Sequence, residues 1–158
     1  MKEDVPMEIR VDDLQGDDIR RLLEEHLEDM YATSPAESVH ALDLNALRHP
    51  DITFWTIWDG DQLAGCIALK QLDAHHAEIK SMRTPRALRR RGAARVLLQH
   101  VIDVAKQRNY ARLSLETGSM RFFEPARQLY ASFGFEFGLP FANYVDDPNS
   151  VFMTKVIR

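Results

Sequence analysis

A basic, glycine-containing junction is the feature that most constrains the fold of this chain. Six arginines surround one glycine, Gly92, within residues 83–95, although the formal net charge of the chain is −4. An alternating apolar run precedes the junction and a helical apolar period follows it at 93–109, so the pattern predicts strand, turn and helix. The N–H groups of such a turn lack intrahelical partners, and the helix dipole adds partial positive charge. We therefore predict an anion site, for a phosphate or pyrophosphate.

Length and composition narrow the class of protein. The chain has 158 residues, of which 45% are hydrophobic and 28% charged, and we expect a single domain spanning residues 1–158. No apolar run approaches the roughly 20 residues needed to cross a bilayer, and the acidic start at residues 1–6 lacks a signal-peptide core. The single cysteine, Cys66, lies in an apolar run and suits a reducing compartment. We expect a cytoplasmic protein without a membrane partner.

The spacing of the histidines does not predict a metal site. His75 and His76 are adjacent, so their side chains diverge in an extended segment, and no Cys/His cluster has zinc spacing. We expect this pair in a surface loop and no bound metal.

The remaining periodicities predict an α/β or α+β fold with one mixed sheet. A hairpin turn is expected at 59–61, and Ser34 is a candidate N-cap for a second helix. Strands are expected at 7–11, 53–58, 62–72, 77–84, 111–116, from 135 onward and at 151–157, and helices at 17–31, 35–49, 93–109 and 124–133.

Two motifs resemble those of the GCN5-related N-acetyltransferase (GNAT) family, which binds acetyl-coenzyme A. Arg89-x-x-Gly92-x-Ala94 resembles its (Arg/Gln)-x-x-Gly-x-(Gly/Ala) signature. Residues 126–135 resemble its Ala-x-x-Leu-Tyr-x-x-x-Gly-Phe block, although Phe123 stands where many members have Asn. The resemblance implies a mixed, mostly antiparallel sheet of about seven strands, flanked by about four helices, with splayed central strands.

The resemblance also implies a set of cofactor-binding residues. The pyrophosphate of acetyl-coenzyme A would bind the backbone N–H groups of residues 89–94, where small side chains allow close approach. The main-chain N–H of Met82 would polarise the thioester carbonyl. The implied cofactor-binding residues are Met82, Arg83, Thr84, Arg89, Arg90, Arg91, Gly92, Ala93, Ala94, Phe123 and Tyr130.

Three side chains are candidates for proton transfer. By family resemblance, Tyr130 is the general acid that protonates the leaving thiolate, and the alternative is a core tyrosine. Glu78 is the first candidate for the general base, and Glu116 is the second. The alternative for Glu78 is an ion pair with Lys80 on the same face of the strand. For Glu116 the alternative is an exposed position at the end of its strand.

The acceptor pocket of this fold is expected between the first helix–helix connection and the last hairpin. Positive charge from Lys80 and Arg83 would favour an acceptor that bears a carboxylate, if both face the pocket. Alternatively, Ser34 only caps a helix and His40 packs on its surface. The candidate acceptor-binding residues are Tyr31, Ser34, Ser38, His40, Lys80, Asn143 and Tyr144, with Phe141 beside the last two.

Taken together, these patterns predict a small-molecule N-acetyltransferase that moves an acetyl group to a primary amine by direct attack in a ternary complex. Residues 34–42 and 143–148 are similar to a bacterial subgroup of acetyltransferases for small carboxylic or auxin-like molecules. The alternatives are acetylation of a protein N-terminus or lysine, and a non-catalytic acyl-coenzyme A sensor. The acidic net charge argues against a nucleic-acid partner. A homodimer is possible, and the sequence leaves O-acetylation open.

Overall fold

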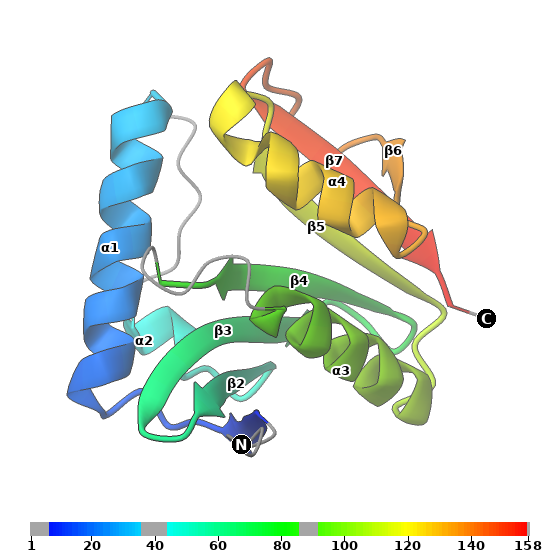
Figure 1. Cartoon of the computed structure of the whole chain (residues 1–158). Coiled ribbons are helices and arrows are strands. Elements are labelled where there is room, and N and C mark those ends of the chain that lie inside the picture. The colour runs from blue at the N-terminus through cyan, green and yellow to red at the C-terminus, as the bar shows by residue number, and fades with distance from the viewer. Residues whose placement is uncertain (1–6, 36–43, 86–91, 158) are drawn as a thin grey trace.

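The computed structural model of the chain describes residues 7–35, 44–85 and 92–157. Within these ranges, seven strands form one sheet and four α-helices cover it (Figure 1). The strands are β1 (Glu8–Val11), β2 (Ile52–Asp59), β3 (Gln62–Gln71), β4 (His76–Arg83), β5 (Arg112–Gly118), β6 (Glu136–Gly138) and β7 (Ser150–Val156). The helices are α1 (Asp17–Thr33), α2 (Leu44–Leu47), α3 (Ala93–Gln107) and α4 (Glu124–Ser132), and a short 3-10 helix, η3 (Arg121–Phe123), precedes α4.

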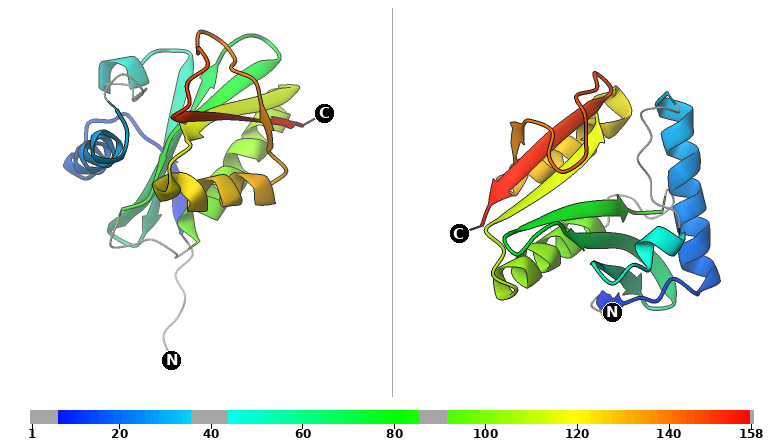
Figure 2. Two further views of the ribbon diagram at one scale, coloured as in Figure 1. Left: turned by 90° about the horizontal axis from the view of Figure 1, so that it is seen from above. Right: turned by 180° about the vertical axis from the view of Figure 1, so that it is seen from behind.

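The sheet lies between two layers of helices. Its strand order is β1-β2-β3-β4-β5-β7-β6, and the β4–β5 pair is parallel whereas the other pairs are antiparallel. Figure 2 shows α1 and α2 on one face of the sheet and α3 and α4 on the other. The predicted mixed sheet of about seven strands with about four helices is therefore confirmed.

Alternation along the central strands produces two hydrophobic cores. Phe54 and Ala68 pack with the apolar side of α1, whereas their neighbours Trp55 and Ile67 pack with α3. Successive side chains of a strand point to opposite faces, so one buried strand serves both layers. Both faces of the sheet are therefore covered. For this reason the sequences of β2 and β3 are apolar at successive positions and do not alternate between apolar and polar residues.

The β4–β5 pair separates along its length. Parallel pairing extends from His76 opposite Arg112 to Ile79 opposite Leu115, and the remaining residues of both strands have no pairing with each other. Beyond Ile79, β4 stays on β3 while β5 stays on β7, and the two ribbons diverge toward α1 (Figure 1). The central strands are therefore splayed, as the family resemblance implied.

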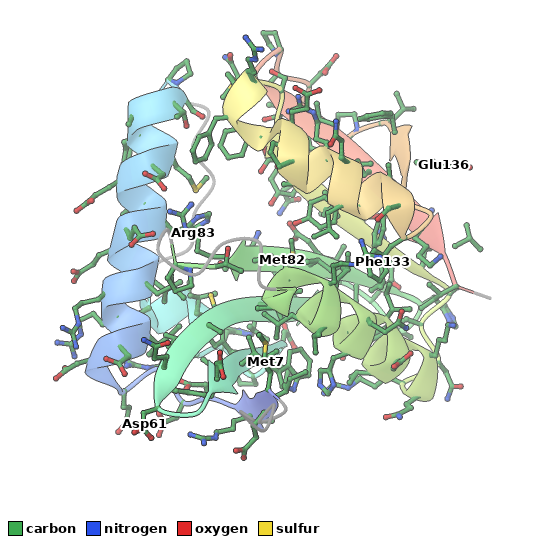
Figure 3. The ribbon with its side chains drawn as sticks, in the orientation of Figure 1. Met7, Asp61, Met82, Arg83, Phe133 and Glu136 are labelled. Atoms are coloured by element: carbon green, nitrogen blue, oxygen red, sulfur yellow. The ribbon has the colours of Figure 1, made fainter. Side chains whose placement is uncertain are left out.

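A β-bulge lies in the diverging half of β4. Cys66 pairs with Arg83 and Ala68 pairs with Lys80, so one residue of β3 lies opposite two residues of β4. One of these two, Ser81, has φ of 54°, in the left-handed region. The extra residue reverses the alternation, as a bulge does. Arg83 consequently points to the α1 side of the sheet (Figure 3).

Some local predictions differ from the structure. Ser34 ends α1, where its backbone N–H donates to Met30 O, and most of the helix expected at 35–49 lies outside the described residues. Of the histidine pair, His75 is exposed in a loop as expected, whereas His76 is buried at the start of β4, paired with β5. Its Nε2 is satisfied by Ser114 Oγ at 2.6 Å. Cys66 is buried as expected. Across the described ranges, none of the helices combines the length and apolar character needed to cross a bilayer.

Candidate functional site

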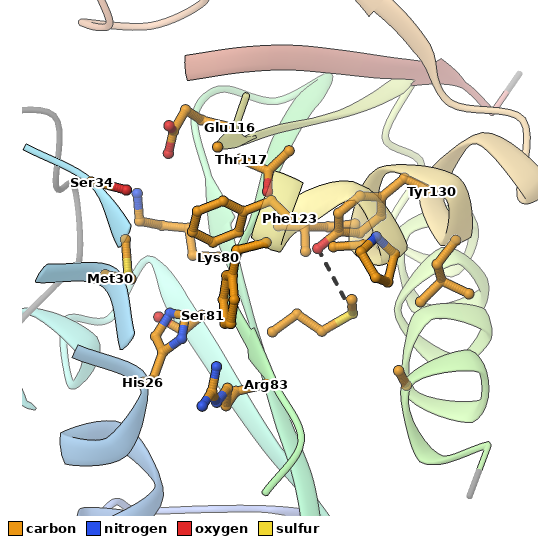
Figure 4. A pocket seen from close by; sticks show the side chains of 18 of the residues that line it. His26, Met30, Ser34, Lys80, Ser81, Arg83, Glu116, Thr117, Phe123 and Tyr130 are labelled. Carbon is orange, nitrogen blue, oxygen red and sulfur yellow. Dashed lines mark hydrogen bonds between the residues drawn. The ribbon is translucent and has the colours of Figure 1, made fainter. Parts of the chain in front are cut away.

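A cavity of about 420 Å³ lies where β4 and β5 separate. Its walls come from α1, from the diverging halves of β4 and β5, and from η3 and α4 (Figure 4). Its volume is in the range of small-molecule sites. The lining residues used below are His26, Met30, Ser34, Glu78, Lys80, Ser81, Met82, Arg83, Thr84, Ala94, Glu116, Gly118, Phe123, Tyr130, Tyr144 and Asn149.

The start of α3 forms one end of the site. Gly92 is the N-cap of α3 and has φ of 84°, which glycine adopts without steric cost. A Cβ built at Gly92 would meet no described atom within 4 Å, so no described residue fills the space beside this backbone. The first turn of α3 contains no acidic residue, and Ala94 from that turn lines the cavity. This end therefore has the backbone donors and the space of an anion site.

Tyr130 brings a phenol into the fork between the strands. The residue is 6% exposed, its ring packs against Phe135, and its hydroxyl lies 3.9 Å from Met82 Sδ (Figure 4). Burial raises the pKa of Tyr130 well above the usual value, and the negative charge of Glu116 raises it further. The phenol therefore keeps its proton at neutral pH and can donate it.

Glu78, Lys80 and Tyr144 form a connected polar group on the cavity wall. Tyr144 donates its hydroxyl proton to Glu78 Oε2 at 2.6 Å, and Lys80 Nζ donates to Tyr144 OH at 2.9 Å and to Glu78 Oε2 at 3.1 Å. The side chains of Lys80 and Glu78 are only 10% and 3% exposed. Burial and then Glu78 raise the pKa of Tyr144. The alternative expected for Glu78, an ion pair with Lys80, is therefore present.

Glu116 lies near both tyrosines of the cavity. It is half-buried on β5, beyond the last residue pair that joins β5 to β4. Its charge contributes to the raised pKa values of both Tyr130 and Tyr144. A carboxylate in this position can exchange protons with groups bound in the fork.

The α1 wall carries a second ion cluster. Arg83 Nη2 donates to Glu25 Oε1 at 3.0 Å and also contacts Asp29 Oδ2, and the Arg83 side chain is only 7% exposed. His26 lies beside Arg83 at the same wall (Figure 4). Burial lowers the pKa of His26 to about 4, and the charge of Arg83 contributes to that shift. The imidazole is therefore neutral at neutral pH.

The structure brings most of the described candidate residues to the cavity. Met82, Thr84, Ala94, Phe123 and Ser34 line it together with the groups above. Ala93 instead packs in the core, at 2% exposure. Five candidates, Ser38, His40, Arg89, Arg90 and Arg91, lie outside the described residues.

Two candidate acceptor residues do not line the cavity. Tyr31 is 56% exposed, because it lies about 100° around α1 from Met30, which faces the cavity. Asn143 is exposed in the connection between β6 and β7, whereas its neighbour Tyr144 turns inward. In both segments a neighbouring side chain lines the cavity instead, Met30 in α1 and Tyr144 before β7. Phe141 supports Tyr144 through ring contact at 5.1 Å rather than lining the cavity.

Sequence reasoning missed His26, Met30 and Asn149. His26, Met30 and Ser34 are spaced four residues apart, so they share one face of α1. That spacing was a usable signal, because a polar histidine interrupts the otherwise apolar face. Asn149 had no such signal, since its place at the cavity depends on the course of the β6–β7 connection.

The family comparison and the curated relatives agree with this geometry. The family model described as "Acetyltransferase (GNAT) family" matches residues 18–135. The chain is 60% identical to the uncharacterized N-acetyltransferase YsnE of Bacillus subtilis, over 94% of this chain and 99% of that protein. It is 47% identical to the uncharacterized N-acetyltransferase YedL of Escherichia coli, over 94% of each. The identity to the IAA acetyltransferase of Azospirillum brasilense is 36%, over 84% of each.

Solved structures share the fold. A Bacillus subtilis acetyltransferase in complex with CoA aligns with a TM-score of 0.70 and 18% identity, over 96% of this chain and 99% of that one. A GNAT family acetyltransferase from Elizabethkingia anophelis with acetyl-CoA bound aligns with a TM-score of 0.68 and 18% identity, over 98% and 99%.

Proposed function

The chain belongs to the acetyltransferase (GNAT) family, and from that premise we propose that it transfers an acetyl group from acetyl-coenzyme A to a primary amine of a small molecule by direct attack. It is an N-acetyltransferase whose donor is acetyl-coenzyme A. When bound in the cavity, the donor supplies the thioester carbonyl that the amine would attack and the thiol that would leave. The observation that carries the proposal is the Tyr130 phenol inside the fork between the splayed strands.

The residues of the site fit this donor. The open backbone at Gly92 and the acid-free start of α3 suit a pyrophosphate, which the N–H groups of residues 92–94 would hold. The fork between β4 and β5 leaves room for an extended arm beside Thr84 and Phe123. Met82 lies in the bulge of β4, where its N–H would donate to the carbonyl oxygen.

We assign the two proton-transfer steps to Tyr130 and Glu116. Tyr130 would protonate the leaving thiolate, since its raised pKa keeps the phenol protonated until the thiolate forms. Glu116 would accept the proton of the attacking amine, directly or through water. Glu78 is less suited as the base, because a proton on its buried carboxylate would disrupt the ion pair with Lys80. We assign Glu78, Lys80 and Tyr144 to the positioning of the acceptor.

A small acceptor is supported by the size of the cavity. The acceptor end is bounded by three residues of α1 and by the Tyr144 side chain, which comes from the connection before β7. The whole cavity of about 420 Å³ has to hold the reacting part of the donor as well as the acceptor, which leaves room for a compact acceptor. A protein lysine or N-terminus would need a groove open to an extended peptide.

The first experiment measures free thiol release from acetyl-coenzyme A with a panel of amines, amino acids, polyamines and aryl carboxylates. We expect release that depends on the acceptor. Thiol release only when the acceptor is a peptide would favour a protein acceptor. Coenzyme A binding without release for any acceptor would favour a sensor and would contradict the proposal.

Exchange of Glu116 for glutamine tests the assignment of the base. We expect Glu116→Gln to lower kcat by about 100-fold, because general base catalysis contributes at least that factor. Glu78→Gln serves as the comparison. It leaves Lys80 buried without its carboxylate partner, so we expect a lower melting temperature but a smaller loss of kcat. The opposite distribution of the two effects would assign the base to Glu78.

A Cβ at Gly118 tests the path of the cofactor arm. Gly118 packs directly against the ring of Phe123, so Gly118→Ala forces that ring to move. We expect coenzyme A affinity, measured by calorimetry, to fall about tenfold, because the ring lines the proposed path. Gly138→Ala is the control, since a Cβ there meets no described atom within 4 Å. Unchanged affinity in Gly118→Ala would remove Phe123 from the cofactor site.

A further inference from the structure

Two buried nitrogen atoms at the acceptor end of the cavity have no hydrogen-bond partner among the described residues. They are His26 Nδ1 and Arg83 Nε. Both side chains line the cavity and lie beside each other at the α1 wall (Figure 4). Unpartnered buried polar atoms are rare in folded proteins, and each carries a free-energy cost. A ligand that bonds to these atoms would recover this free energy.

The charges around this pair favour an uncharged ligand group. Arg83 already faces the carboxylates of Glu25 and Asp29, and Lys80 already faces the carboxylate of Glu78. Among the described residues that line the cavity, both cationic side chains thus have carboxylate partners. A carboxylate on the acceptor would add a further negative charge beside Glu25 and Asp29, and like charges repel strongly in a buried site. Lys80 and Arg83 both line the cavity, which was the condition for a carboxylate-bearing acceptor, but their charges are already compensated by these carboxylates.

The hydrogen-bonding capacity of the two atoms narrows the group further. Arg83 Nε only donates, so it requires an oxygen or a nitrogen lone pair from the ligand. His26 is neutral, because burial and Arg83 lower its pKa to about 4, so its Nδ1 either donates or accepts. A carboxamide supplies both a carbonyl oxygen and N–H groups, and it carries no charge. It therefore satisfies both atoms in either tautomer of His26.

We propose that His26 and Arg83 recognise an uncharged hydrogen-bonding group of the acceptor, such as a carboxamide, and thereby select amines that carry it over amines that carry a carboxylate. The inference rests on the proposed function, since it specifies the acceptor of the same site. The acceptor class is then a primary amine with a neutral carbonyl-containing group at its other end.

The test compares ω-amino carboxamides with ω-amino carboxylates of equal chain length. Calorimetry on the protein saturated with coenzyme A, which lacks the acetyl group, measures binding without turnover. For the chain length that fits, we expect the amide to bind about tenfold more tightly than its carboxylate, because the carboxylate faces the negative charges of Glu25 and Asp29 and has no N–H group for His26 Nδ1. Equal or tighter binding of the carboxylates, or no binding of any amide, would overturn the proposal.

Variants assign the preference to the two side chains. His26→Leu is expected to abolish the preference for the amide. His100→Leu is its matched control, because His100 Nε2 is also buried without a hydrogen-bond partner in the described part of the chain, yet His100 packs against Trp55 away from the cavity lining. Arg83→Lys keeps the positive charge for Glu25 and Asp29 and removes Nε, and its melting temperature shows whether it folds. Retention of the preference in His26→Leu would contradict the proposal.

The same ligands separate this inference from the proposed function. Thiol release from acetyl-coenzyme A with amides and carboxylates alike, without a binding preference, would overturn the inference and leave the transfer reaction intact. Tight, His26-dependent binding of amides without thiol release would support the inference and contradict acetyl transfer to them.

Discussion

Replacement of Tyr130 by phenylalanine is expected to lower kcat by about 100-fold while coenzyme A affinity changes little, because the phenol would act as general acid only during transfer. The ring contact with Phe135 is retained in the variant, so the fold should persist. The measurement is thiol release under saturating acetyl-coenzyme A, with calorimetric binding of coenzyme A alongside. Because the pKa of Tyr130 is raised, its proton is retained as the pH approaches 10, and the wild-type rate should not decline there through this residue.

The matched control for this change is Tyr110→Phe. Tyr110 is also buried, at 4% exposure, but it packs in the core on the α3 side and does not line the cavity. Removal of its hydroxyl should leave kcat unchanged. Equal kcat in the Tyr130 and Tyr110 variants and the wild type would show that Tyr130 has only a packing role.

Replacement of Gly92 by alanine is expected to weaken coenzyme A binding by about tenfold or more. The left-handed φ of 84° costs a non-glycine residue about 1–2 kcal/mol. In addition, the new Cβ would occupy the open space beside the start of α3, where we place the pyrophosphate. Calorimetry gives the affinity, and thermal unfolding gives the cost to the fold.

Gly60→Ala separates strain from binding. Gly60 has φ of 60° in the β2–β3 hairpin, and a Cβ there also meets no described atom within 4 Å. Both variants should lose similar stability, but only the Gly92 variant should lose coenzyme A affinity. Comparable losses of affinity in the two variants would mean that strain, not blocked access, explains the effect.

Local patterns in the sequence were sufficient for the elements that form the cofactor end of the site. Strand alternation before residue 84, the glycine at the turn and the apolar period of 93–109 depend on neighbouring residues only. The helix predicted at 93–109 is present as α3, and Gly92 in the predicted turn is its N-cap. The resemblance of the second motif likewise pointed to Tyr130, which the structure places in the cavity.

The long-range partners of the charged residues Lys80 and Arg83 could not be predicted from local patterns. Lys80 and Arg83 appeared as a pair of positive charges for a carboxylate acceptor. In the structure, Lys80 pairs with Glu78, the local alternative that strand alternation had offered. Its second partner is Tyr144, 64 residues later, and Arg83 bonds to Glu25, 58 residues earlier. Such partners are separated widely in the sequence, and no local period relates them.

The sequence alone determined the order of the elements and the family of the chain, because both follow from short-range periodicity or from contiguous motifs, and it predicts an anion site at the start of α3. Only the tertiary structure decided which side chains face the cavity and which charges are already compensated. The physical reason is the separation of β4 from β5 together with the bulge at Ser81, which turns Arg83 toward α1. A one-residue change in strand register moves a side chain to the other face, and no local pattern in this chain marked its position.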